Sequence, residues 1–124
     1  MMLNEGNALL GAVADIDGFI LACLVDASTG MVLASRKDHQ SIAAPAAAAG
    51  AADIVNVLSM LAGEVETDGL EDVMVTFRSQ FYVIRPVSQD PDTHILLLVI
   101  LDRLRTNLAM ARREIRNFCA NFAA

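Results

Sequence analysis

Cysteine is scarce in this chain of 124 residues. Cys23 and Cys119 are the only two, and they do not form a cluster. A disulfide framework or a structural zinc site needs several cysteines at short spacings. The two cysteines therefore indicate reduced thiols inside a core, as is typical of a cytosolic protein. We predict no metal site.

Basic residues are also few. Nine Lys and Arg stand against fifteen Asp and Glu, which gives a net charge of −6. This balance argues against nucleic acid as the main partner, because binding to phosphates needs a basic face. We expect the arginines of the last quarter of the chain to form a solvated face, or else to dock an acidic partner or anionic lipid. They are Arg103, Arg105, Arg112, Arg113 and Arg116.

The chain lacks side chains that would converge for catalysis. His39 and His94 lie beside predicted loops, and neither has a Cys or a second His at the spacing of metal ligands. Ser28 and Thr29 fall in a predicted turn, where hydroxyl groups usually bond to the backbone. No glycine-rich phosphate loop is present. We therefore expect a protein that is not an enzyme and that needs no cofactor.

Long hydrophobic runs are absent as well. The longest strongly apolar run, Ile95 to Leu101, is far shorter than the roughly 20 residues of a membrane-spanning helix. The first residues, MMLNEGNALLGAVA, include Glu5 but no Lys or Arg, so they lack the basic start of a signal peptide. We therefore expect neither a membrane span nor export.

Apolar residues are nevertheless abundant. They make up 55% of the chain, and the mean hydropathy is +0.47. A domain of this size has more apolar residues than its interior can take, so some of them must lie on the surface. A surplus of this kind marks an interface with a partner protein.

Hydrophobic periodicity predicts an α+β domain. Asp26 and Gly30 mark the turn of a hairpin, and Pro45 fits the first turn of an Ala-rich helix, although Ser41 could cap an earlier, kinked turn. Asp102 is the expected N-cap of the last helix. The predicted elements are a helix over 3–14, strands over 19–25 and 31–35, a helix over 45–63, strands over 73–78, 81–87 and 95–101, and a helix over 102–122.

The order of these elements predicts one antiparallel sheet. The runs 19–25 and 95–101 are apolar on both faces and therefore belong in its centre. Five strands with these two in the middle give the order 2-1-5-4-3. The third strand, 73–78, is then an edge that is apolar and free of Pro, and such an edge is prone to pairing.

A stripe of small and apolar side chains follows the Ala-rich helix. Ala46, Gly50, Ile54 and Val57 step by three or four residues, so they share one face. Gly50 costs a helix about 1 kcal/mol relative to Ala, which suggests that a close contact repays the cost. The stripe could pack on the chain's own sheet or on another protein, and the sequence leaves both alternatives open.

About 110 residues, from Leu9 to Phe118, resemble the roadblock/LC7 family. The matching features are LVDASTG (24–30), MVLAS (31–35), the Ala-rich second helix, and the last strand leading into LRTNLAMARREIRNF (104–118). The resemblance implies one five-stranded antiparallel sheet with helices on both faces. It also implies a homodimer in which the second helices pack together and the third strands pair. The implied dimer interface consists of Ala46, Gly50, Ile54, Val57, Val73, Val75 and Phe77.

The resemblance further implies a regulatory function. Members of the family associate with small Ras-like GTPases in bacteria and archaea, or with scaffolds in eukaryotes. We therefore expect a homodimeric module that binds a small Ras-like GTPase and modulates its nucleotide state, with Arg36, Arg78 and Arg85 as candidate donors to a partner's phosphate. The alternatives are a dimeric structural adaptor that binds no GTPase and, with less support from the residues, a sensor of small molecules.

Overall fold

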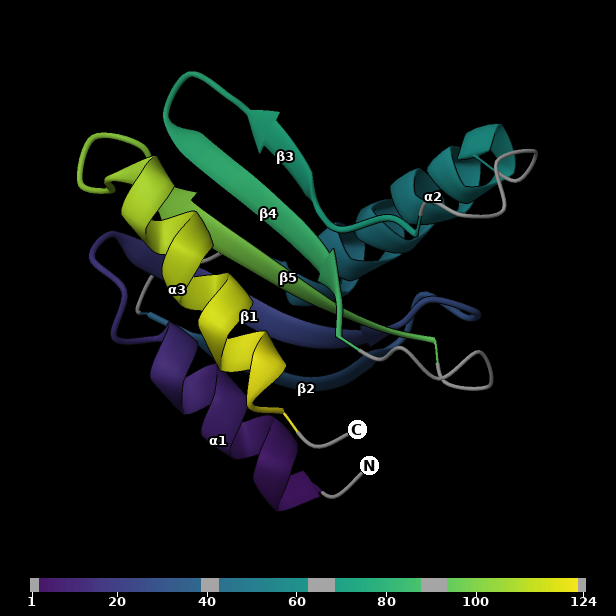
Figure 1. Cartoon of the computed structure of the whole chain (residues 1–124), viewed down its shortest axis with the longest axis horizontal. Helices are drawn as coiled ribbons and strands as arrows, with labels where there is room; N and C mark the ends of the chain where they lie inside the picture. The colour runs from purple at the N-terminus through teal and green to yellow at the C-terminus, as the bar shows by residue number, and fades with distance from the viewer. Residues whose placement is uncertain (1–2, 39–42, 63–68, 88–93, 123–124) are drawn as a thin grey trace.

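The computed structural model describes residues 3–38, 43–62, 69–87 and 94–122. Helices and strands follow one another in the predicted order, α-β-β-α-β-β-β-α (Figure 1). They are α1 (Leu3–Val13), β1 (Phe19–Asp26), β2 (Val32–Lys37), α2 (Ala44–Ala62), β3 (Val73–Thr76), β4 (Gln80–Pro86), β5 (Ile95–Asp102) and α3 (Leu108–Ala120).

The five strands form one antiparallel sheet in the order β2-β1-β5-β4-β3, which confirms the predicted topology. β1 and β5 are buried along their whole length except for their last residues, Asp26 and Asp102. Strands with apolar side chains on both faces must be covered on both faces, so they occupy the centre. β2 and β3 are left as the two edges.

The sheet separates two apolar layers. α1 and α3 cover one face, and α2 lies against the other (Figure 1). Because side chains alternate along a strand, Leu24 points into the layer of α1 and α3, while the neighbouring Cys23 points into the layer of α2. The helices on both faces agree with the architecture that the family resemblance implies.

The turn of the β1–β2 hairpin supports α2. Asp26 Oδ1 accepts a hydrogen bond from the backbone N–H of Ser28 at 2.9 Å, and Gly30 has a φ of +76°, so both turn residues act as predicted. A Cβ atom on Gly30 would lie 3.4 Å from Ala49 Cα, and Asn56 Nδ2 donates to the carbonyl oxygen of Ala27 at 3.2 Å. The hairpin is therefore part of the framework that holds α2 in place.

The bounds of several elements differ from the prediction. β3 ends at Thr76 instead of residue 78, because Phe77 already donates its N–H to the carbonyl oxygen of Gln80 at 2.8 Å and starts the turn. β2 is shifted and ends at Lys37. Pro45 lies in the first turn of α2, as expected. Ser41 lies outside the described residues.

The start of the last helix was predicted wrongly. Asp102 ends β5, and its Oδ1 accepts from Leu104 N at 3.0 Å in a turn. α3 begins at Leu108, and its N-cap is Asn107, whose side chain accepts from Met110 N at 3.1 Å. Leu104, which the periodicity places in the core, is 92% exposed. An Asp before an apolar periodic run fits an N-cap and a turn equally well, so the sequence could not separate the two.

Both thiols are buried and free, as predicted. Cys23 lies in the α2 layer and Cys119 in the opposite one, so the sheet separates them. Burial raises the pKa of each thiol from 9.0 to about 11, and Arg85 partly opposes this increase at Cys119. Both groups therefore stay protonated and unreactive near neutral pH.

Candidate interaction surface

α2 buries only a narrow face. It packs on the sheet through four small or β-branched side chains, Ala48, Ala51, Ala52 and Val55. On an α-helix, Ala46, Gly50 and Val57 lie about opposite to these residues. Ala46 and Gly50 are exposed, and Val57 is 63% exposed. The predicted stripe therefore faces away from the chain's own sheet, which removes the alternative that it packs there.

The glycine of this stripe has no structural role inside the chain. Apart from its chain neighbours and the backbone of its own helix, a Cβ atom added to Gly50 would meet no atom of the described residues within 4 Å. Near the end of the helix, Met60 and Leu61 are 80% and 78% exposed, and they extend the apolar surface. The residues that form it are Ala46, Gly50, Ile54, Val57, Met60 and Leu61, which we call the α2 stripe.

The apolar character of α2 bears on the expectation that the chain has no membrane span. By length and composition alone, Ala44–Leu61 could cross a membrane: its mean hydropathy is 1.4, and 22% of it is buried in the domain. A search for unbroken runs of strongly apolar residues does not detect this helix, because Ala dominates it and polar residues are spaced out along it. α2 nevertheless packs on the sheet and belongs to the folded domain.

A second apolar area adjoins α2 on the same face of the sheet. α2 lies mainly over β1, β2 and β5, and Val73 and Tyr82 of the neighbouring strands are only partly buried beside it. Val75 pairs with Tyr82 and therefore shares its face. Phe77, half exposed, meets Tyr82 edge to face at 4.9 Å between ring centroids. Tyr82 was not predicted, because its place follows only from the register of β3 with β4.

β3 adds an unpaired edge to this apolar area. Among the described strands β4 is the one partner of β3, so no described strand pairs with the backbone N–H and C=O groups on its other side. Its four residues, VMVT, carry no charge and no Pro that would block a further strand. The opposite edge, β2, ends in Arg36 and Lys37, which make pairing unfavourable. The edge formed by β3 is therefore the one suited to pairing.

The seven residues predicted for a dimer interface fall on two elements. Ala46, Gly50, Ile54 and Val57 lie on the outer side of α2, and Val73, Val75 and Phe77 lie at the β3 edge. Each has some solvent exposure in the single chain. Their contact with a second chain stays a prediction.

The three arginines considered as phosphate donors have different surroundings. Arg85 is 15% exposed, and its Nη1 lies 3.8 Å from carboxylate oxygens of both Glu71 and Asp72, so it is already paired. Arg36 lies over α1, where its Nη1 would be 3.3 Å from a Cβ on Gly11. Arg78 is exposed in the β3–β4 turn. They do not form one cluster.

Metal and nucleophile chemistry finds no support in the described part of the chain. No three side chains among its His, Cys, Asp and Glu gather to hold a metal ion. Thr29 Oγ1 accepts from Met31 N at 3.2 Å, which is the backbone role expected of a turn residue. His94 is exposed, and His39 lies outside the described residues.

Comparisons with known proteins relate the fold to solved structures. No family model matches the sequence, and no curated protein matches it. MglB from Myxococcus xanthus is similar in structure, with a TM-score of 0.81 and 19% identity over 97% of this chain and 93% of that chain. An MglB with a tetrameric arrangement has a TM-score of 0.81 and 15% identity, over 97% of this chain and 86% of that chain. A roadblock/LC7 domain from Streptomyces avermitilis has a TM-score of 0.75 and 16% identity, over 91% of this chain and 90% of that chain.

These similarities cover almost the whole chain at identities that establish the fold and no more. They agree with the resemblance found in the sequence and with the observed strand order. The chain therefore has the roadblock/LC7 fold.

Proposed function

We propose that the protein is a non-enzymatic regulatory module that forms a homodimer, binds a small Ras-like GTPase and modulates its nucleotide state. It would act in the cytoplasm. The fold shared with MglB and with a roadblock/LC7 domain supports the proposal, since the family resemblance implies association with such GTPases. One of the similar MglB structures has a tetrameric arrangement, which supports self-association of this chain as well.

The observation that carries the proposal is the exposed α2 stripe beside the unpaired β3 edge. Ile54, Val57 and Leu61 are 38%, 63% and 78% exposed on a helix that is otherwise fixed to the sheet. Each Å² of apolar surface that these side chains expose to water is unfavourable by about 25 cal/mol relative to its burial. A second copy that places its own α2 and β3 against these elements would bury the stripe and satisfy the edge.

A composite surface made by two copies suits a regulator that has no catalytic groups of its own. A GTPase changes rate when its switch segments are held in one arrangement, and a rigid surface can bias that equilibrium through differential binding. No convergent nucleophile and base occur in the described part of the chain, so the effect would come from binding the partner.

The proposal is tested in two steps. Immobilised protein is incubated with extract of its own source, supplied with GDP or with a non-hydrolysable GTP analogue, and retained GTPases are identified by mass spectrometry. GTP hydrolysis and nucleotide exchange by the purified GTPase are then measured with and without the protein. We expect retention to depend on the nucleotide and one of the two rates to change.

A dimer that retains no GTPase in either nucleotide state would contradict the regulatory part of the proposal. That result would favour the alternative function, a dimeric structural adaptor. Val75→Lys is the control variant: it should lose both the dimer and any effect on the GTPase, since Lys at an apolar strand edge opposes pairing.

A further inference from the structure

The turn between β5 and α3 carries a large apolar side chain in an unusual position. Leu104 is 92% exposed, more than any other large hydrophobic residue in the described part of the chain. Its backbone is held by a hydrogen bond, since Leu104 N donates to Asp102 Oδ1 at 3.0 Å. The preceding Arg103 donates its N–H to the carbonyl oxygen of Ser79 at 3.0 Å and its Nη1 to that of Phe77 at 3.1 Å.

The other side of the turn is fixed as well. Arg105 N donates to the carbonyl oxygen of Asp102 at 3.2 Å, and Thr106 Oγ1 donates to that of Asp17 at 2.9 Å. The turn therefore holds Leu104 outward in one arrangement. Because the backbone that carries Leu104 is fixed, docking of this residue requires little ordering of the backbone, which is a property of anchor residues.

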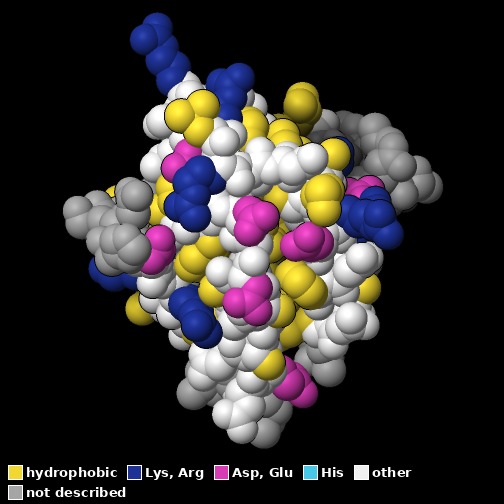
Figure 2. Space-filling model, turned by 90° about the vertical axis from the view of Figure 1, so that its left-hand side faces the viewer, with side chains coloured by type: hydrophobic (Ala, Val, Ile, Leu, Met, Phe, Trp, Pro, Cys, Tyr) yellow, Lys and Arg dark blue, Asp and Glu magenta, His cyan; other side chains and the backbone are white. Residues whose placement is uncertain are grey.

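Charge surrounds this anchor. The connections α1–β1, β3–β4 and β5–α3 lie at the left-hand side of Figure 1, which faces the viewer in Figure 2. Apolar side chains lie there among acidic and basic ones. Arg103 is engaged with Phe77 and lies 5.7 Å from the ring of Phe81. Arg105 is exposed and has no ion pair within the described residues. The anchor thus fits an apolar groove with a carboxylate at its rim.

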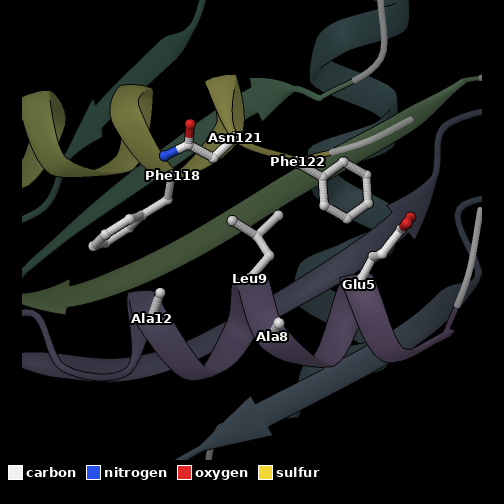
Figure 3. A pocket seen from close by; sticks show the side chains of 7 residues that line it. All are labelled: Glu5, Ala8, Leu9, Ala12, Phe118, Asn121 and Phe122. Atoms are coloured by element: carbon white, nitrogen blue, oxygen red, sulfur yellow. The ribbon is translucent and has the colours of Figure 1, made fainter.

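The chain itself contains such a groove. It lies between α1 and α3 and has a volume of about 470 Å³. In Figure 3, Leu9 of α1 points toward α3 between Phe118 and Phe122, with Glu5 at the Phe122 end and Ala12 at the Phe118 end. The lining residues are Glu5, Ala8, Leu9, Ala12, Phe118, Asn121 and Phe122.

The groove complements the anchor in shape and in charge. Ala8 and Ala12 are four residues apart on α1. Their small side chains leave room in the groove beside Leu9, which itself lies between the two aromatic rings (Figure 3). Glu5 is the one charged residue of the lining, and it could pair with the arginine that accompanies Leu104. Aromatic side chains around an apolar cleft are typical of the pockets that receive anchor residues.

We propose that Leu104 of one copy inserts into the α1–α3 groove of a second copy, with Arg105 near Glu5. The contact that we infer is head-to-tail between two different surfaces of the chain, and a head-to-tail contact whose rotation does not close gives an open chain of copies. It extends the protein into longer assemblies as concentration rises. The contact uses neither the α2 stripe nor the β3 edge, and it does not depend on the proposed function.

Sedimentation velocity over a range from low micromolar to submillimolar concentration tests the contact. The wild-type protein should show an average mass that keeps increasing with concentration. Leu104→Asp should remove the increase, and so should Ala8→Trp, which fills the groove at an exposed position of α1. We expect each change to weaken the contact by about tenfold or more.

Two matched variants control for folding and for surface chemistry. Met110→Asp places the same charge at another exposed apolar residue, and Asn7→Trp places the same ring on α1 outside the groove lining. Both should assemble like the wild type. Circular dichroism checks that all variants fold.

A mixture of the two disabling variants gives the decisive result. Leu104→Asp retains an intact groove and Ala8→Trp retains an intact anchor, so together they should form complexes that neither forms alone. The proposal fails if Leu104→Asp assembles like the wild type, or if the mixture forms no complex. Loss of a dimer in Val75→Lys, by contrast, reports only on the interface of the proposed function.

Discussion

Asp72 and Arg112 form a bidentate ion pair that joins the start of β3 to α3. Arg112 Nε lies 2.8 Å from Asp72 Oδ2, and Arg112 Nη2 lies 3.0 Å from Oδ1. Arg85 of β4 approaches the same carboxylate at 3.8 Å. The Asp72 side chain is only 7% exposed, although it lies at the edge of the sheet. Asp72, the residue before β3, thus links the start of the edge strand to α3.

We predict that Asp72→Asn destabilises the fold. It removes the charge that pairs bidentately with Arg112, and it leaves the largely buried Arg85 with the exposed Glu71 as its one remaining acidic neighbour in the described part of the chain. The free energy of unfolding should fall by about 1–3 kcal/mol, measured by urea denaturation. Glu71→Gln is the control: Glu71 is 62% exposed, so its loss should change stability by less than about 0.5 kcal/mol. Equal effects of the two changes would contradict the role of Asp72.

Asn107 should be the residue that starts α3. Its side chain accepts a hydrogen bond from Met110 N, so Asn107→Ala leaves a backbone N–H of the first turn unsatisfied. The expected loss is about 1 kcal/mol in the free energy of unfolding, with circular dichroism as the readout. Asn107→Asp should preserve the cap. If Asn107→Ala unfolds at the same urea concentration as the wild type, the cap contributes nothing.

Substitutions of Gly50 should affect the stability of the single chain and its association in different ways. Because no atom lies near its missing Cβ, Gly50→Ala should favour the helix of the single chain by up to about 1 kcal/mol. Gly50→Leu should leave the single chain folded but prevent close contact between two α2 helices, and light scattering should report a smaller particle. An intact dimer in Gly50→Leu would show that the α2 stripe is not the interface.

The two buried thiols predict a specific loss of stability at high pH. Each pKa is about 11 in the folded chain and 9.0 as the ordinary value, because burial disfavours the thiolate. Below pH 9 both states keep the protons, and the thiols have no effect on pH dependence. Between pH 9 and 11 only the unfolded chain releases them, so the free energy of unfolding should fall by about 1.4 kcal/mol per pH unit for each thiol.

Urea denaturation at about pH 9.5, 10 and 10.5, all within this window, measures the slope. The control is the variant with both Cys23→Ala and Cys119→Ala. Tyr and Lys titrate in both proteins, so the difference between the two slopes isolates the thiols. Parallel slopes would mean that burial does not hold the thiols protonated.

The sequence was sufficient for the topology, because the fold follows from a few strong patterns. Strands that are apolar on both faces, such as 95–101, have to be central. Asp26 and Gly30 are residue types that favour a tight turn, so they mark the hairpin. Local ambiguities caused the errors. Asp102 could cap a helix or close a turn. The hydrogen bond from Arg103 N to the carbonyl oxygen of Ser79, which is far away in the sequence, favours the turn.

The candidate surfaces were predictable to different degrees. Helical spacing alone groups Ala46, Gly50 and Val57, but their position away from the sheet depends on which face α2 buries. Tyr82 joins them only through its register with Val75. The anchor at Leu104 was hidden, because a Leu at helical spacing from Leu108 fits a core stripe until the turn before α3 is known.

The proposed homodimer is held together by the α2 stripe and the β3 edge of each copy. Sedimentation equilibrium at low micromolar concentration tests it most directly, with Ser35→Lys on the opposite edge as a control for Val75→Lys. We predict a particle of twice the chain mass of 13.3 kDa for the wild type and for Ser35→Lys, and its loss in Val75→Lys. A folded, soluble wild-type particle of 13.3 kDa would contradict the account.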